Sequence, residues 1–211
     1  MEIQEIDALD PEEFRDRLHQ ARIKPNTHWS CESKFPYGLF TDSPRQAAIL
    51  VPLLRRENKW HVLYTQRNAN LPEHSGQVAF PGGRIEEGDR SLEETALREA
   101  YEEINLLPQD VNILGQLHEL HTISNYCVTP FVGVIPWPYP FKLEVEEVSL
   151  IFTLPLTWLA DPQNHEERWR ELPQPYDPVP VIYFHSYAGE LLWGVSADIT
   201  LFLIDALQLN K

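Results

Sequence analysis

Cysteine and basic residues are scarce in this 211-residue sequence. Its two cysteines, Cys31 and Cys127, lie far apart without a recognisable spacing, which argues against a disulfide framework and a structural zinc site. The chain has 17 Lys and Arg against 32 Asp and Glu, a formal net charge of -15. Nucleic acids and anionic membranes attract clustered basic residues, so we expect neither as a partner.

Long apolar runs are also missing. No stretch approaches the roughly 18 consecutive apolar residues of a transmembrane helix. The first ten residues, MEIQEIDALD, lack the basic and apolar regions of a secretory signal, so we expect a cytoplasmic protein. Hydrophobic residues make up 43% and charged residues 23%, a composition typical of a globular fold with a substantial core.

Turn residues and apolar spacing divide the chain into helices and strands. Asp10 and, three positions later, Glu13 are typical of a helix start, and the apolar spacing predicts a helix over residues 10–22. Two further helices are expected over 91–106 and 196–209. The segments with strand character are 47–54, 60–67, 111–120, 128–135, the first part of 145–162, and a hairpin over 180–194 that turns at Ala188-Gly189.

No repeat and no change in composition marks a second domain. Residues 1–45 are expected to hold the N-terminal helix and an irregular lead-in, and residues 46–211 the folded domain. This order of elements predicts an α+β fold in which a mixed β-sheet lies between helices.

The segment 91–106 concentrates acidic residues on one side. Glu99, Glu102 and Glu103 stand at i, i+3 and i+4, so a helix places them on one face, where like charges repel. A divalent cation removes that penalty, and an all-oxygen ligand set favours Mg²⁺ or Mn²⁺. Arg98, beside this face, is expected to pair with an acid of the preceding loop and fix its position. The alternative is a surface helix whose acids face only water.

The stretch GGRIEEGDRSLEETALREAYEEINL, residues 82–106, resembles the signature of the Nudix hydrolases. That signature is G-x5-E-x7-R-E-U-x-E-E-x-G-U, where U is a bulky apolar residue. The matching positions are Gly83, Arg98, Glu99, Glu102, Glu103 and Leu106.

Three features of this stretch depart from the signature. Asp89 stands where the signature has Glu, and eight residues instead of seven separate it from Arg98. Asn105 replaces the late glycine, and Asn tolerates the left-handed backbone conformation that glycine usually supplies. The departures leave the R-E-x-x-E-E register intact, and they leave open which loop acid pairs with Arg98.

Upstream, LYTQRNANLPEHSGQVAFPGG (residues 63–83) resembles the extended box of the coenzyme A pyrophosphatase branch of this family. That branch also has Asp and the loop that is one residue longer, so Asp89 agrees with it. Two positions differ, because Pro72 stands where the branch usually has Arg and Asn68 where it has Ser. The matching positions are Arg67, His74, Gly76, Gln77 and residues 78–83.

The resemblance implies a metal-dependent hydrolase that splits coenzyme A or an acyl derivative into 3′,5′-ADP and 4′-phosphopantetheine. Its partner is then a small-molecule nucleotide, and its cofactor is Mg²⁺ or Mn²⁺. The catalytic residues that it implies are Arg98, Glu99, Glu102 and Glu103, of which the three glutamates are metal ligands. The substrate-binding residues that it implies are Arg67, His74, Gly82, Gly83 and Arg84.

Several alternatives stay open at this point. One is another nucleoside diphosphate derivative as substrate, such as an ADP-sugar, a dinucleoside polyphosphate or an oxidised nucleoside triphosphate, and another is a Nudix-fold binding module without turnover. The oligomeric state is open too, with a homodimer allowed. The remaining candidates are Glu102, Glu144, Glu146 and Glu147 for the general base, Arg55 or Arg56 as further phosphate contacts, and Trp137 and Tyr139 for stacking on adenine or covering pantetheine.

Overall fold

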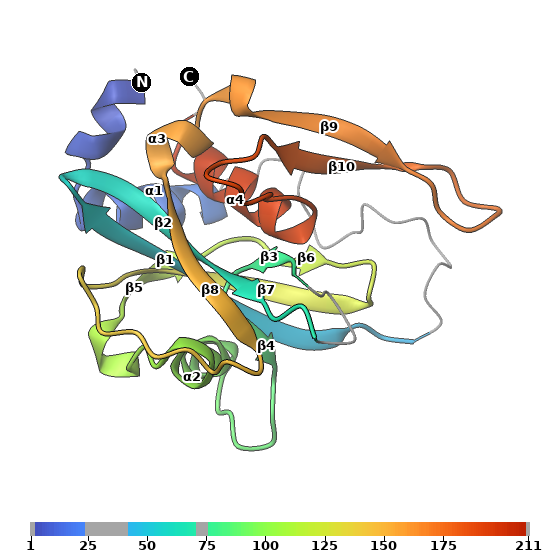
Figure 1. The fold of residues 1–211 in the computed structure, drawn as a ribbon, viewed down its shortest axis with the longest axis horizontal. Helices are drawn as coiled ribbons and strands as arrows, with labels where there is room; N and C mark the ends of the chain where they lie inside the picture. The colour runs from blue at the N-terminus through green and yellow to red at the C-terminus, as the bar shows by residue number, and fades with distance from the viewer. Residues whose placement is uncertain (1–2, 24–41, 71–75, 210–211) are drawn as a thin grey trace.

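Strand β1 (Arg45–Arg56) is the centre of the main sheet, because three other strands pair with it (Figure 1). It runs parallel to β7 (Tyr126–Val134) and antiparallel to β2 (Lys59–Arg67) and β4 (Gly82–Arg84). The computed structural model describes residues 3–23, 42–70 and 76–209. The remaining elements of the eight-stranded sheet are β3 (Val78–Ala79), β5 (Asn112–Gln116), β6 (Leu120–His121) and β8 (Val148–Pro155).

The hairpin predicted from 47–54 and 60–67 is confirmed. Glu57 and Asn58 turn the chain between β1 and β2 with positive φ angles of 53° and 61°. A two-residue turn of this hand matches the twist of the strands that it joins. Sheet pairing therefore begins next to the turn, with Arg56 opposite Lys59.

Helices cover both faces of the sheet, so the predicted α+β arrangement is confirmed. Figure 1 shows α1 (Pro11–Ile23) and α4 (Val195–Ala206) on one face and α2 (Leu92–Ile104) on the other. Side chains of β1 alternate between the two cores, with Val51 packed on the α4 side and Leu50 on the α2 side. No helix in the described ranges is long and apolar enough to cross a membrane.

Helix α1 begins as the sequence predicts. The Asp10 carboxylate accepts a hydrogen bond from the Glu13 N–H at 2.9 Å, and the Glu13 carboxylate accepts one from the Asp10 N–H at 2.8 Å. Its Phe14 and Leu18 side chains are buried in the same core as α4. The short elements of the fold are the 3-10 helices Ile3–Ala8, Pro108–Asp110 and Pro162–Asn164 and helix α3 (Leu156–Leu159).

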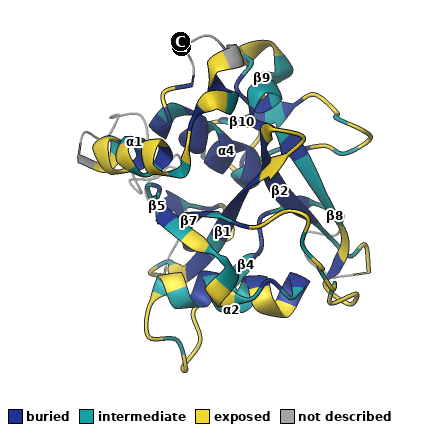
Figure 2. Ribbon diagram, turned by 90° about the vertical axis from the view of Figure 1, so that its left-hand side faces the viewer, coloured by how far each residue is buried: buried dark blue, intermediate teal, exposed yellow. Residues whose placement is uncertain are grey.

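The hairpin predicted over 180–194 is confirmed only in part. β10 (Val179–Phe184) pairs antiparallel with β9 (His165–Arg170), which the sequence did not indicate. The turn at Ala188-Gly189 exists, but only isolated bridges flank it, between Tyr187 and Glu190 and between Tyr183 and Trp193. The sequence did not predict β9 because five of its six residues are exposed, so no apolar alternation marks it. Buried residues are instead concentrated in elements such as β1, β2 and α4 (Figure 2).

Candidate active site

Helix α2 carries the acidic residues and is held rigidly from its first turn to its last. The Ser91 hydroxyl caps its start by accepting the Glu94 N–H at 3.1 Å. Ala96, Ala100 and Ile104 are fully buried against the sheet. Asn105 ends the helix in the left-handed conformation, with φ 56° and ψ 35°, and so takes the backbone role that glycine has in the signature.

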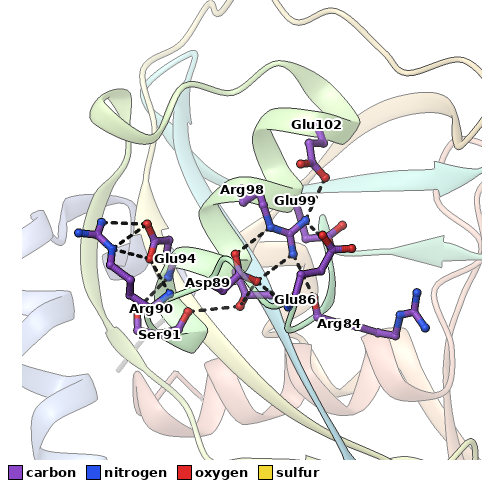
Figure 3. A network of polar contacts seen from close by, with 10 residues as sticks. Arg84, Glu86, Asp89, Arg90, Ser91, Glu94, Arg98, Glu99 and Glu102 are labelled. Atoms are coloured by element: carbon purple, nitrogen blue, oxygen red, sulfur yellow. Dashed lines mark hydrogen bonds and ion pairs between the residues drawn. The ribbon is translucent and has the colours of Figure 1, made fainter.

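Arg98 is the centre of a polar network that joins α2 to the preceding loop (Figure 3). Its guanidinium donates to both oxygens of Asp89, at 2.9 and 3.0 Å, and to the Arg84 carbonyl at 3.0 Å. It also donates to the carboxylates of Glu99 and Glu102, each at 3.0 Å. Asp89 is therefore the loop acid that the sequence left undetermined.

The Asp89 carboxylate is almost completely enclosed, with 3% of its side chain exposed. Besides Arg98, it accepts hydrogen bonds from the Glu86 N–H and from the Thr95 hydroxyl, both at 2.9 Å. The Arg98 guanidinium, together with these donors, holds the pKa of Asp89 well below its usual range. The carboxylate thus stays charged and ties the loop to the helix.

Gly82 and Gly83 let the chain pass close to both β1 and α2. A Cβ atom on Gly83 would lie 2.5 Å from Cδ of Glu99, and one on Gly82 would lie 2.6 Å from Cα of Ile49. Neither separation is possible for real atoms, so any larger residue would displace the carboxylate or the strand. The glycine pair therefore seats the Glu99 carboxylate against β4.

Glu99 and Glu103 form a close pair of partly desolvated acids. Burial raises the pKa of both, and the charge of Glu99 raises the pKa of Glu103 further, to about 8. Glu103 is 4% exposed, and its Oε2 atom has no hydrogen-bond partner in the described part of the chain. A buried acceptor beside a like charge is costly unless a cation or proton satisfies it.

The resemblance implies a divalent cation, and two of the three predicted ligands, Glu99 and Glu103, fit one. The orphaned Oε2 of Glu103 and the neighbouring Glu99 carboxylate supply the oxygen ligands that Mg²⁺ and Mn²⁺ prefer. Glu102 is turned to Arg98, with 55% of its side chain exposed. Across residues 3–23, 42–70 and 76–209, no three His, Cys, Asp or Glu side chains converge in a geometry that would hold a metal ion.

Two of the predicted substrate-binding arginines lie in different surroundings. Arg67 ends β2, and its charge lowers the pKa of Glu103, which places the two side chains near each other. Its Nε atom is buried without a hydrogen-bond partner among the described residues. Arg84 is exposed, and Figure 3 shows its guanidinium pointing away from Arg98. His74 and Pro72 lie outside the described residues.

The structure separates Glu147 from the other glutamates of its loop. Its charge raises the pKa of both Glu99 and Glu103 more than the charge of Glu144 or Glu146 does. The sequence offered these three as equal candidates for a general base. Glu147 is thus the member of the cluster that lies closest, in electrostatic terms, to the paired acids of α2.

Arg55 and Arg56, the further candidates for phosphate contacts, lie at the far end of β1 from the acids. Ile49 of β1 pairs with Gly82, at the end of the strand near the acids. Arg56 is seven residues further along β1, a distance of about 23 Å in an extended strand. Arg55 donates to the carbonyls of Asp7 and Asn58 at that end, so it does not face the acids.

The aromatic candidates are also placed away from the acids. Arg56 lies over the Trp137 ring, 5.9 Å from its centroid, at the far end of β1. The Tyr139 hydroxyl is used within the fold, because it donates to Asp110 at 2.8 Å and accepts the Leu107 N–H at 3.1 Å. Neither ring is therefore placed to stack on an adenine bound near Glu103.

Known proteins resemble this chain in sequence and in fold. Over 112 residues it is 45% identical to the uncharacterized Nudix hydrolase NudL of Escherichia coli (strain SMS-3-5 / SECEC), and NudL of Shigella boydii serotype 18 gives the same figures. The match covers 53% of this chain and 58% of the relatives, so it spans little more than half of their length.

Among solved structures, the Caenorhabditis elegans Ap4A hydrolase binary complex has a TM-score of 0.46 and 23% identity, over 52% of this chain and 80% of that one. The NUDIX domain of Shewanella oneidensis NrtR, complexed with ADP ribose, has a TM-score of 0.42 and 24% identity, over 58% and 79%. The family model of the NUDIX domain matches residues 44–177, well over half of the sequence. The chain belongs to the Nudix hydrolase family.

Proposed function

We propose that this Nudix hydrolase cleaves the diphosphate of coenzyme A or an acyl derivative, giving 3′,5′-ADP and (acyl-)4′-phosphopantetheine. The observation that carries the proposal is the seating of Glu99 against the glycine turn together with the buried Glu103, on which the charge of Arg67 acts. Paired carboxylates suit a cation, and a neighbouring guanidinium suits a phosphate. Together they suit a metal-bound diphosphate.

The acids of α2 would hold the cation. Glu99 and Glu103, which are both desolvated by burial, would supply two of the ligands. Glu102 would join them by leaving Arg98. When bound, Mg²⁺ or Mn²⁺ would neutralise charge on the diphosphate and make a bound water more acidic. Arg98 would keep Glu99 and the Asp89 loop in place through its hydrogen bonds to both.

In the reaction, the oxygen of a water molecule bonds to one phosphorus while the bridging P–O bond breaks. The other phosphate leaves with the bridging oxygen. Arg67 would bind a phosphate oxygen and offset charge as that bond breaks, since a guanidinium stays protonated throughout. Glu147, which acts electrostatically on both metal-binding acids, would take the proton from the attacking water.

The choice of coenzyme A rests on residues 63–83, which match the extended box of that branch, and on the loop containing Asp89. The relatives named NudL support the same family without defining a substrate. Pro72 favours a second candidate, because the arginine usual at that position in the branch is missing. That candidate is the same chemistry on another nucleoside diphosphate derivative, such as an ADP-sugar or a dinucleoside polyphosphate.

Residues 46–211 are the part that we assign to this function, with 1–45 as an N-terminal addition. The test is a panel of diphosphates, namely coenzyme A, an ADP-sugar, a dinucleoside polyphosphate and an oxidised nucleoside triphosphate, with product identification by liquid chromatography. We expect the highest kcat/KM for coenzyme A or an acyl derivative. A higher value for another member would support the second candidate, and binding without turnover of any of them in saturating Mg²⁺ would support a non-catalytic module.

A further inference from the structure

A one-residue bulge interrupts the pairing of β2 with β8 directly beside Arg67. Gln66 pairs with Leu150, but Arg67 pairs with Val148, so Ser149 has no partner in the ladder. The Ser149 hydroxyl fills the irregularity by donating to the Gln66 carbonyl at 3.2 Å. Bulges of this kind change the direction of side chains and often lie next to active sites.

The bulge determines which residue lies opposite the end of β2. Beyond it, the Asn68 N–H donates to the Glu147 carbonyl at 2.8 Å. With the regular register of Gln66 and Leu150 continued, Asn68 would instead stand opposite Val148. The bulge therefore places the backbone of Glu147, the last residue before β8, opposite Asn68.

The Asn68 side chain fixes the turn that leads into β8. Its amide nitrogen donates to the Val145 carbonyl at 2.6 Å, and its Oδ1 accepts the Asn70 N–H at 2.9 Å. The other end of the turn is attached to α2, because the Glu144 N–H donates to the Glu103 carbonyl at 2.9 Å. The turn 144–147 is therefore held between β2 and the last turn of the helix that bears the acids.

We infer that Asn68 is a positioning residue: with the bulge at Ser149, it holds the turn 144–147, and with it Glu147, against the last turn of α2, which bears Glu103. The inference deepens the proposed function and rests on it where Glu147 is the proton acceptor. The electrostatic effect of Glu147 on both acids of α2 agrees with this placement. The sequence shows only that Asn68 stands where the branch has Ser.

The test compares N68A and N68D with N70A. Asp retains the acceptor for the Asn70 N–H but loses the amide donor to Val145, whereas Ala loses both. Asn70 is exposed and offers only its backbone N–H to Asn68, so N70A is the matched control.

We expect N68A and N68D to weaken Mn²⁺ binding several-fold, measured by electron paramagnetic resonance of the free ion, and to speed amide exchange across 144–148. We expect kcat to fall about tenfold, because a small displacement of a catalytic group slows the reaction strongly. N70A should match the wild type in all three.

The same substitution in an E147Q background shows whether Asn68 acts through Glu147. A positioning role predicts that N68A changes neither Mn²⁺ affinity nor kcat further once Gln replaces Glu147, since the two effects are not additive. Equal losses in both backgrounds, or a lower melting temperature with unchanged Mn²⁺ affinity, would overturn the inference. Measurements of Mn²⁺ affinity and of amide exchange require no turnover, so they test the role of Asn68 even if the chain cleaves no diphosphate.

Discussion

Arg98 and Asp89 are joined by two parallel hydrogen bonds, from Nε to Oδ1 at 2.9 Å and from Nη2 to Oδ2 at 3.0 Å. This bidentate pair links the middle of α2 to the loop that follows β4, and the same guanidinium reaches Glu99. A planar fork of donors sets both the distance and the orientation of the loop. Relative to the family signature, this loop has Asp instead of Glu and one additional residue. The pair of Arg98 and Asp89 accommodates both differences.

Replacing Arg98 tests this link. R98K keeps the charge but removes the fork, and we expect it to lower kcat and Mn²⁺ affinity about 10- to 100-fold, as loss of a metal site's outer partners does. R90A is the control, because Arg90 forms an exposed pair with Glu94 in the same loop and helix. Steady-state kinetics and Mn²⁺ titration of both variants check the prediction. Wild-type values for R98K would show that the fork has no organising role.

The glycine turn offers a second test with a control in the same loop. G83A places a methyl group against the Glu99 carboxylate, so we expect at least a tenfold loss of activity. G88A has open space around its added methyl group and should keep the wild-type rate. If G83A were as active as G88A, the seating of Glu99 against β4 would be irrelevant to turnover.

In the metal-free protein, ionisation of Glu103 should reduce stability as the pH rises from 5 to 8. Burial lowers the pKa of His61 and His165, so these residues act in the opposite direction, equally in the wild type and in a Glu103 variant. The folded-state pKa of Glu103 is about 8, above its ordinary value of 4.5, so the folded state binds more protons across this window. The unfolding free energy in chelator should fall by a few kcal/mol, at about 1.4 kcal/mol per pKa unit. Asp89 does not contribute, since Arg98 makes it titrate below this window.

Urea unfolding at the two pH values measures this slope, and E103Q is the control. Gln cannot ionise, so E103Q should lose much less stability over the same window. Saturating Mn²⁺ should restore the wild type chiefly at pH 8, by stabilising the ionised carboxylate. An equal slope for wild type and E103Q would rule out Glu103 as the titrating group.

Arg84 and Arg67 should contribute differently to the use of coenzyme A. The charge of Arg67 acts on Glu103, so R67A should lower kcat/KM for coenzyme A and for 3′-dephospho-coenzyme A alike. Arg84 is exposed beside the site, and R84A should remove most of the preference for the 3′-phosphate, about 1.5–3 kcal/mol for a charge-assisted bond. R56A, at the far end of β1, is the control. If coenzyme A and the dephospho form reacted equally with the wild type, the chain would fall outside the coenzyme A branch.

The parts of the fold that depend on neighbouring residues could be predicted from the sequence. Helix α2 could be predicted because Ser91, the buried stripe and Asn105 are all local signals. β9 could not, because its one large apolar residue, Trp169, is 69% exposed and only backbone pairing to β10 defines the strand. Pairing between distant segments is invisible to local pattern.

The candidate site divides in the same way. The spacing of Glu99 and Glu103 predicted their common face, and Arg98 was expected to pair with a loop acid. Glu147 could not be separated from Glu144 and Glu146, because its position depends on how β8 pairs with the distant β2. Nor could sequence show that Arg55 lies at the wrong end of β1, since the position of β4 along that strand decides it.

The most direct test of the account is phosphorus NMR of coenzyme A incubated with the protein, with and without Mg²⁺. We predict that the diphosphate signals disappear only with the metal, and that 3′,5′-ADP and 4′-phosphopantetheine appear in equal amounts. E99Q and E103Q, which keep shape but remove charge, should fold normally and be slower by orders of magnitude. An intact diphosphate under these conditions would contradict coenzyme A as the substrate, and full activity of both variants at limiting Mg²⁺ would contradict the assigned metal site.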